Sequence, residues 1–245
     1  MRLFSRITVA VAAITAGTAP PAAAQNGFLF EEPRVTVTVR GGHHAAAANS
    51  DIYDFFTDEL TLSRGDFSGF ALAGDIGIRL SSHADLVVGI GRTATTKGSE
   101  FRDWVDQDDL PIEQTTSLER VPLTATLKVY PLARGRSIGS NAWVPARLTP
   151  FVGAGAGALH YELTHGGDFV DFETFEIFPD HFASSGWTRS MHVLAGADYW
   201  LNTRFGLTGE GRYTWATAPL QADFRRFDDI DLRGFQATAG ISIRF

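Results

Sequence analysis

The segment Phe235-Gln-Ala-Thr-Ala-Gly-Ile-Ser-Ile-Arg-Phe245 alternates between apolar and polar side chains along its whole length. The odd-numbered positions hold Phe, Ala or Ile, and the even-numbered positions hold Gln, Thr, Gly, Ser and Arg. Successive side chains of a β-strand point to opposite faces of a sheet. The segment therefore predicts a strand with one apolar face and one polar face.

The same alternation recurs along the rest of the chain. Clear copies lie at residues 35–39, 70–80 and 121–129, and weaker copies at 86–95, 151–163, 187–201 and 205–216. This gives about eight strands of about ten residues each, the length that a tilted strand needs to cross a bilayer. The sequence thus predicts an all-β fold, a closed antiparallel eight-stranded up-and-down transmembrane β-barrel.

The connections between these strands alternate in length. Residues 81–84 and 202–203 are short, whereas 43–67, 96–117, 164–184 and 218–231 are long; 132–147 is of medium length. Short turns on one side and long loops on the other are typical of outer-membrane barrels, whose turns face the periplasm. We therefore expect both termini in the periplasm and four long loops outside.

Charge is distributed unevenly over these segments. The chain has 245 residues and a net charge of −7, and the four long loops hold 20 of its 28 acidic residues. A net acidic chain lacks the positive surface that binding to phosphates requires, so nucleic acid is excluded as a partner. The extracellular end is predicted to be strongly acidic.

The N-terminus reads as an export signal. Arg2 and Arg6 precede the apolar run 7–14, and Ala22-Ala23-Ala24 supplies small residues for cleavage. We therefore expect a signal peptide at 1–24, an N-terminal periplasmic segment at 25–33 and the barrel at 34–245. The chain has no cysteine, so disulfides cannot stabilise the exported fold.

The polar face of the predicted strands carries many charged side chains. The residues expected to face the lumen are Arg40, Asp75, Arg79, Lys128, His192, Asp198, Glu210, Arg212 and Arg244. An eight-stranded barrel is only wide enough inside to be filled by side chains, and buried ions must be paired. We therefore interpret these residues as a structural charge network that fills the lumen, with a conduction path as the alternative.

Taken together, the export signal, the eight alternating strands and the terminal aromatic residue resemble the small outer-membrane β-barrel proteins of the OmpA, OmpX and OmpW type. The resemblance implies a monomer in the outer membrane of a Gram-negative-type bacterium, surrounded by outer-membrane lipid and lipopolysaccharide. It also implies that Ile243 and Phe245 form the signal read by the barrel assembly machinery. The match is one of pattern, so it is informative for fold and weak for activity.

The long loops are rich in phenylalanine. Phe169, Phe172, Phe175 and Phe178 alternate with acidic residues in the third loop. Large apolar side chains are costly to leave in water, so we expect this aromatic cluster to pack the loops together over the barrel mouth. The alternative is an apolar vestibule that admits a small hydrophobic ligand, as in a narrow OmpW-like channel.

Candidates for chemistry are few. His43 and His44 point to opposite faces of a strand and cannot readily share a metal ion, while His160 and Glu162 share a face but lack a well-placed serine. Gly153-Ala-Gly-Ala-Gly157 lacks the Lys-Ser/Thr of a P-loop and predicts close strand approach instead. We expect no catalytic residues, no metal and no cofactor.

The sequence thus predicts a structural or surface-interaction role, in membrane integrity, adhesion or ligand contact through the loops. The rivals are the narrow channel, a lipid-modifying barrel enzyme and a secreted lipocalin-like barrel. A lipocalin-like barrel would need an apolar lumen, whereas here the charged parity is expected to face inward.

Overall fold

The computed structural model describes residues 32–245, with the exception of 107, 139–141, 172–173 and 175. The predicted signal peptide and most of the segment 25–33 lie outside the described residues, as do Phe172 and Phe175. Eight long strands run antiparallel to their neighbours: β1 (Val35–Ala46), β2 (Gly69–Arg79), β3 (Ala84–Val105), β4 (Pro111–Val129), β7 (Leu148–Val170), β8 (Ile177–Trp200), β9 (Phe205–Trp215) and β12 (Gly234–Arg244).

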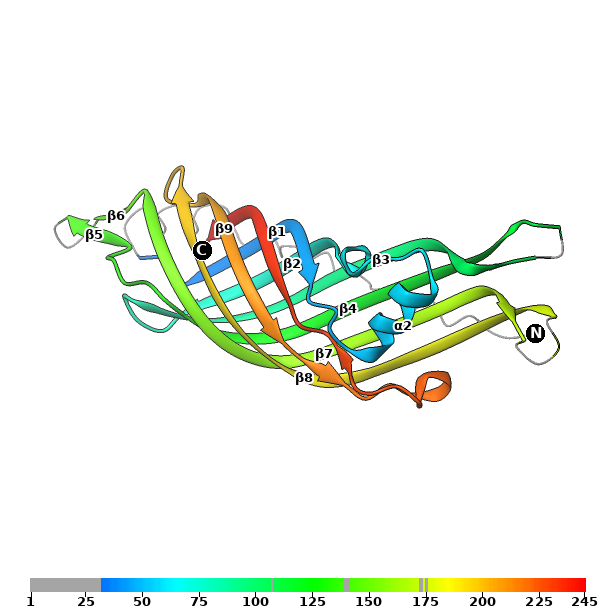
Figure 1. The fold of residues 1–245 in the computed structure, drawn as a ribbon. Helices are drawn as coiled ribbons and strands as arrows, with labels where there is room; N and C mark the ends of the chain where they lie inside the picture. The colour runs from blue at the N-terminus through cyan, green and yellow to red at the C-terminus, as the bar shows by residue number, and fades with distance from the viewer. Residues whose placement is uncertain (1–31, 107, 139–141, 172–173, 175) are drawn as a thin grey trace, which may run out of the picture.

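These strands form a closed barrel in the order β1-β12-β9-β8-β7-β4-β3-β2 (Figure 1). The first and last strands meet along a continuous register from Thr36 opposite Arg244 to Ala46 opposite Gly234. The predicted fold class, an eight-stranded up-and-down barrel, is confirmed.

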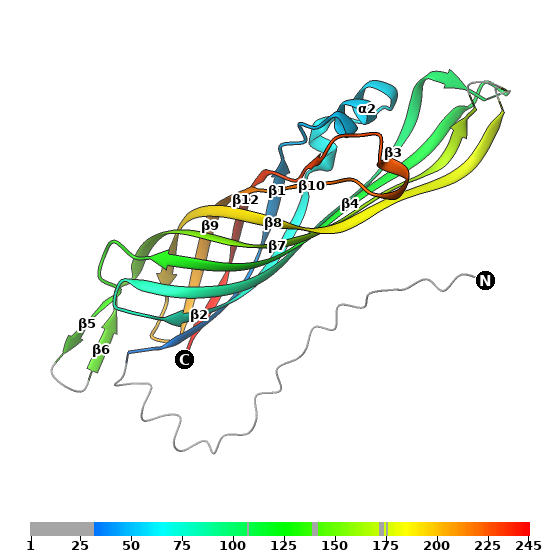
Figure 2. The ribbon, with the colours of Figure 1, turned by 90° about the horizontal axis from the view of Figure 1, so that it is seen from below.

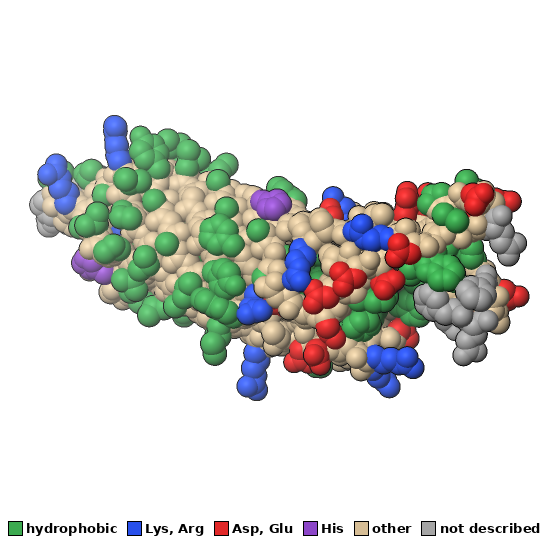
Figure 3. Space-filling view, viewed as in Figure 1, with side chains coloured by type: hydrophobic (Ala, Val, Ile, Leu, Met, Phe, Trp, Pro, Cys, Tyr) green, Lys and Arg blue, Asp and Glu red, His purple; other side chains and the backbone are tan. Residues whose placement is uncertain are grey.

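The two faces of the sheet differ as the alternation predicts. Ile241 and Leu127 are 57% and 49% exposed on the outside, whereas Arg244 is 5% exposed. Figure 3 shows apolar side chains spread over the half of the barrel that carries the C-terminus, and acidic side chains gathered toward the opposite end. An apolar belt around a polar interior is the inverse of a water-soluble barrel and is the surface that a bilayer requires.

The connections at the C-terminal end are short. Residues 80–83 join β2 to β3, residues 201–204 join β8 to β9, and a small hairpin of β5 (Gly135–Ile138) and β6 (Ala142–Pro145) lies between β4 and β7. In keeping with the predicted orientation, we call this the periplasmic end and the opposite end extracellular.

The connections at the extracellular end contain short elements. Helix α2 (Asp51–Glu59) and the 3-10 turn η1 (Arg64–Phe67) lie between β1 and β2. Between β9 and β12 lie β10 (Thr217–Ala218), η2 (Ala222–Phe224) and β11 (Ile230–Asp231). Among the described residues, no helix is long and apolar enough to cross a membrane.

Two segments expected to be loops are strands, so that part of the prediction was wrong. Residues 96–105 and 111–117 continue β3 and β4, and 164–170 and 177–184 continue β7 and β8, as two hairpins that project well beyond the barrel (Figure 2). The pairing of Lys97 with Thr116 and of His165 with Phe182 lies in these extensions. The alternation persists there, but its buried positions include the polar Gln114 and Thr116, so apolar periodicity does not reveal the strands.

The free edges of the projecting hairpins are covered by the other two extracellular connections. On the β3 edge, the Thr61 N–H donates to the Glu100 carbonyl at 2.9 Å. On the β8 edge, the Ala183 N–H donates to Asp223 at 3.3 Å, and nearer the barrel the Thr188 hydroxyl donates to the Thr217 carbonyl at 2.6 Å. Covered edges offer fewer backbone groups for pairing with another chain.

The glycine-rich part of β7 lies close to its neighbours. A Cβ on Gly157 would be 2.0 Å from the Leu123 carbonyl oxygen, and one on Gly155 would be 2.7 Å from the His192 ring. Both distances are too short for a side chain, so the close strand approach predicted for residues 153–157 is present.

Candidate functional site

An ion-pair network occupies the middle of the lumen. Its centre is Glu210 on β9, whose Oε1 lies 2.5 Å from Arg40 Nη1 and 3.1 Å from Arg212 Nη2. Lys128 Nζ approaches the other carboxylate oxygen at 3.8 Å. Arg40 also forms an ion pair with Asp75 on β2. Five charges from four walls of the barrel therefore meet in one contact network.

This network leaves little free space beside it. A cavity between Asp75, Gly89, Thr124 and Arg212 has a volume of about 20 Å³, which is room for about one water molecule. Arg40, Asp75 and Glu210 are each at least nine-tenths buried. Charged side chains therefore occupy this cross-section of the lumen.

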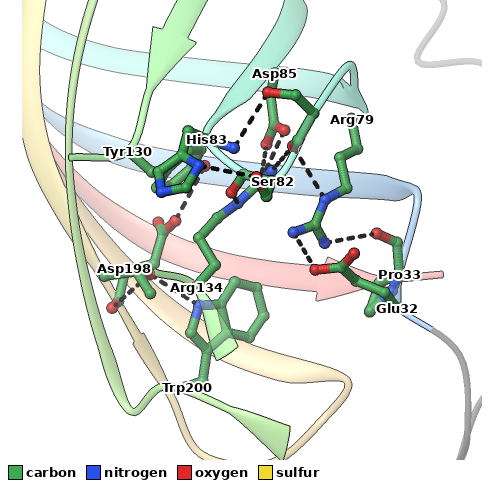
Figure 4. Close-up of polar contacts among 12 residues, drawn as sticks. Glu32, Pro33, Arg79, Ser82, His83, Asp85, Tyr130, Arg134, Asp198 and Trp200 are labelled. Carbon is green, nitrogen blue, oxygen red and sulfur yellow. Dashed lines mark hydrogen bonds and ion pairs between the residues drawn. The ribbon is translucent and has the colours of Figure 1, made fainter. Parts of the chain in front are cut away.

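The periplasmic end of the lumen holds a second polar cluster (Figure 4). Arg134 Nη1 contacts both carboxylate oxygens of Asp85, at 2.7 and 2.8 Å, and its Nε donates to the Ser82 carbonyl at 3.0 Å. Arg79 pairs with Glu32 and donates to the Pro33 carbonyl at 3.3 Å. These contacts fasten the turn at 80–83 and the segment before β1 beneath the barrel.

The nine predicted lumen residues thus occupy several places. Arg40, Asp75, Lys128, Glu210 and Arg212 form the central network. Arg79 and Arg244 lie at the periplasmic end, where the Arg244 guanidinium stacks 3.2 Å from the centre of the Trp200 ring.

His192 and Asp198 are buried outside the central contacts. His192 Nε2 is hydrogen-bonded to Thr126 at 2.8 Å, and Tyr130 donates to Asp198 at 3.5 Å. The sequence did not indicate Asp85 and Arg134 as residues of the lumen. Asp85 lies at the start of a strand and Arg134 in a connection, so neither belongs to a clear alternating run.

A hydrophobic cap closes the extracellular mouth. Helix α2 turns Ile52, Tyr53 and Phe56 inward, and all three are completely buried. They pack with residues from the barrel wall and from the β9–β12 connection: Leu118, Leu159, Tyr161, Leu163, Phe224, Ile230 and Leu232. We call this cluster the cap core.

Hydrogen bonds fasten the cap to the β9–β12 connection. The Tyr53 hydroxyl donates to the Asp231 carbonyl at 2.9 Å, and the Asn49 N–H donates to the Asp231 carboxylate at 3.2 Å. Burial raises the pKa of Tyr53 to about 12. Burial also opposes ionisation of Asp231, but hydrogen bonds from Arg233 and Asn49 outweigh it and lower the pKa of that carboxyl.

A buried arginine that the sequence did not indicate lies beneath the cap. Arg120 on β4 is 2% exposed, and its Nη1 lies 2.8 Å from His44 Nε2. Its Nη2 donates to the Phe67 carbonyl at 3.5 Å. Arg120 shares the inward-facing parity of Leu118 and Thr124, but it lies one residue before the predicted strand 121–129, so the sequence did not indicate it.

The two described members of the predicted aromatic cluster, Phe169 and Phe178, lie on strands rather than in a loop, which corrects their placement. Phe169 is in β7 and Phe178 in β8, opposite each other, with ring centroids 6.3 Å apart. Phe169 also contacts Phe182 and His165, at 4.8 and 5.3 Å. His165 in turn lies 4.9 Å from Phe56 of the cap core. Burial, assisted by the nearby His181, lowers the pKa of His165 to about 4.

Three imidazoles contact hydroxyl groups, the pairing that acyl-transfer chemistry uses. Two of them, Thr126–His192 and Thr116–His165, are buried, and the third joins the adjacent Ser82 and His83 in an exposed turn. His192 Nδ1 has no hydrogen-bond partner among the described residues, so the acid that orients the base of a triad is lacking there. Within the described part of the chain, no group of three or more metal-ligating side chains comes together.

The closed sheet, the apolar belt and the charged interior are those of an outer-membrane β-barrel. Comparison with protein-family models gave no match, and comparison with curated proteins gave none either. Solved structures of small outer-membrane proteins do align with the chain. Neisserial surface protein A aligns over 86% of this chain and 97% of its own, at 13% identity and a TM-score of 0.47.

Two further solved structures show the same extent of overlap. The outer membrane protein OprG of Pseudomonas aeruginosa aligns over 87% of this chain and 97% of its own, at 14% identity and a TM-score of 0.48. The attachment invasion locus protein Ail of Yersinia pestis covers 86% and 99%, at 11% identity and a TM-score of 0.44. These similarities concern the fold.

Proposed function

We propose that this protein is a non-conducting outer-membrane barrel that displays an acidic β-sheet at the cell surface. Its role is structural and interactive: the barrel anchors the projecting hairpins, and the hairpins contact other molecules. The observation that carries this proposal is the central ion-pair network around Glu210, which fills the lumen.

Two barriers in series support the absence of conduction. The first is the central network, in which the Glu210 carboxylate contacts Arg40, Arg212 and Lys128. The second is the cap core, where Phe56 and Tyr53 are completely buried across the mouth. Opening a path would require breaking buried ion pairs and exposing a hydrophobic cluster together.

The projecting hairpins support the interactive part. They extend from the barrel as paired strands and expose acidic side chains, among them Glu113, Asp168 and Asp180. Figure 3 shows acidic side chains concentrated at this end. A rigid acidic surface held away from the membrane suits contact with cationic partners.

Conductance in planar lipid bilayers tests the proposal. The wild-type barrel should be silent, whereas a variant with Arg40→Ala, Glu210→Ala and a Gly-Ser linker in place of residues 49–64 should conduct. The matched control is Glu162→Gln, which removes one exposed carboxylate from the outside of β7 and should stay silent. Steady single channels from the wild type would contradict the proposal.

A second candidate is a narrow channel for small hydrophobic molecules. The observation in its favour is the aromatic series Phe182, Phe169, His165 and Phe56, which leads from a projecting hairpin to the cap core with neighbouring ring centroids 4.8 to 5.3 Å apart. Uptake of a fluorescent fatty acid into vesicles tests this candidate. Faster uptake through wild type than through Phe169→Asp would favour the channel over the non-conducting barrel.

A further inference from the structure

A groove lies on the outer wall of the barrel at the extracellular end of the apolar belt. It has a volume of about 500 Å³ and runs between β7, β8 and β9. Arg189, Met191, Trp215 and Arg233 line it, and Ala156 and Gly157 belong to its β7 side. The groove therefore combines an apolar floor with two guanidinium groups.

The glycine-rich part of β7 explains why there is a depression here. Ala154, Ala156 and Ala158 present only methyl groups on the outward parity, and the intervening glycines have no side chains. The adjacent strand β8 carries the bulky outward Met191, which is 68% exposed, and β9 beyond it carries Trp215, which is 44% exposed. Small side chains next to large ones leave a depression in the outer wall here.

The two arginines differ in how far they are neutralised. Arg233 forms an ion pair with Asp231 through Nε and Nη2, at 2.8 and 3.0 Å. Arg189 is exposed, and no hydrogen bond or ion pair engages it within the described part of the chain. The Arg189 guanidinium is thus available to bind an anion. So are the N–H donors of Arg233 that Asp231 does not engage.

The level of these arginines matches that of lipid headgroups. Arg189 lies two residues beyond Met191 toward the extracellular end, and Met191 is paired with Trp215 in the register of β8 and β9. Arg233 lies two residues beyond the outward-facing Phe235. Tryptophan marks the membrane interface, and phosphates lie directly above the acyl chains.

We propose that this groove binds lipid A of the outer leaflet, with a phosphate between Arg189 and Arg233 and an acyl chain along Ala156 beside Met191. A guanidinium presents parallel N–H donors that match phosphate oxygens. The choice of lipid A follows from the extracellular position of the groove, because lipopolysaccharide forms that leaflet. The site goes beyond the proposed function and is independent of whether the lumen conducts.

Native mass spectrometry of the folded full-length barrel in detergent tests the site, with purified bis-phosphorylated lipid A as the probe. Wild type should retain one lipid per barrel. Arg189→Gln with Arg233→Gln should weaken retention at least about tenfold, since both charge-assisted contacts to the phosphate are lost. Ala156→Leu, which fills the floor without altering charge, should weaken it as well.

Controls separate this site from general attraction to charge. Arg225→Gln with Arg226→Gln removes the same charge from exposed positions after η2 and should leave retention unchanged. Dephosphorylated lipid A should bind wild type as weakly as lipid A binds the double variant. The heat-modifiable band on electrophoresis verifies that each variant is folded. Equal retention by wild type and the Arg189/Arg233 variant, or equal retention of phosphatidylglycerol and lipid A, would overturn the proposal.

Discussion

Arg40 and Glu210 form an ion pair of 2.5 Å at the centre of the lumen, where both side chains are at most 3% exposed. The two residues come from β1 and β9, on either side of β12, so their contact ties the strands that flank the last strand. Glu210 also faces Arg212 and Lys128, and its carboxylate is therefore the shared counter-ion of three cations.

Replacing this shared counter-ion should destabilise the barrel strongly. Glu210→Gln leaves the buried Arg40 and the partly buried Lys128 and Arg212 with Asp75 as the remaining carboxylate of the contact network. Removing one partner of a buried pair costs about 3–5 kcal/mol, and we expect a loss of that size in the free energy of unfolding. Urea unfolding in lipid vesicles measures it. The exposed Glu162→Gln should change stability by less than about 0.5 kcal/mol, and equal losses in the two variants would disprove the counter-ion role.

Substitutions of two adjacent phenylalanines should affect the stability of the cap very differently. Phe56 is completely buried in the cap core, whereas its neighbour Phe55 is 40% exposed. Phe56→Ala should cost the cap about 3–5 kcal/mol and release the segment that carries Arg64. Trypsin cleavage after Arg64 reports this opening and should be much faster in Phe56→Ala than in Phe55→Ala. Similar cleavage rates would show that α2 is not held by its buried face.

The cap region should weaken in mild acid because of His165. Its pKa is about 4 in the folded protein and about 6.5 when exposed, so between these values the unfolded state takes up a proton that the folded state does not. The contribution of His165 to the free energy of unfolding is therefore fully present above pH 6.5. It falls by up to about 3 kcal/mol as the pH drops toward 4, and this group causes no further loss below that pH.

Hydrogen exchange of β7 amides between pH 4 and pH 7, corrected for the intrinsic exchange rate, measures this dependence. His165→Gln should make this dependence shallower. The matched control is His181→Gln. Because His181 is exposed, this variant should retain most of the pH dependence. A slope that persists unchanged in His165→Gln would assign the effect to another group.

The terminal aromatic residue should matter for assembly more than for packing. Phe245 is 61% exposed, and its backbone closes the seam through hydrogen bonds between its N–H and the Val35 carbonyl, and between its carbonyl and the Arg34 and Val35 N–H groups. Phe245→Ala should reduce the folded, heat-modifiable fraction in outer membranes several-fold. Phe205→Ala removes a similarly exposed ring at the same end of the barrel and should not, and equal reductions would contradict the predicted assembly signal.

The barrel could be predicted from the sequence because a lipid-facing strand repeats a simple pattern. Ile241 and Ile243 alternate with Ser242 and Arg244, and the structure places these two sets on opposite faces. The projecting hairpins could not be predicted in the same way. There the buried parity mixes apolar side chains with polar ones, and buried positions such as Gln114 and Thr116 are indistinguishable from loop residues.

For the polar sites, the alternation predicts which face of a strand a side chain occupies, but not which side chains it contacts. Parity places Arg40 and Glu210 inside, but it does not show that they touch, since their strands are far apart in the chain. Arg134 comes from the connection between β4 and β7 and reaches Asp85 only after the chain has folded back. Arg189 stands on the outward parity, and its significance appears only when the neighbouring strands complete the groove.

Collision accessibility of single spin labels tests most directly which face of the sheet meets lipid. The chain has no cysteine, so Ile241→Cys and Ser242→Cys each give one labelling site in an otherwise unchanged barrel. In lipid vesicles, a label at 241 should collide with dissolved oxygen and be shielded from a water-soluble nickel complex, whereas a label at 242 should be shielded from both. High oxygen accessibility at 242 together with nickel accessibility at 241 would reverse the faces and contradict the account.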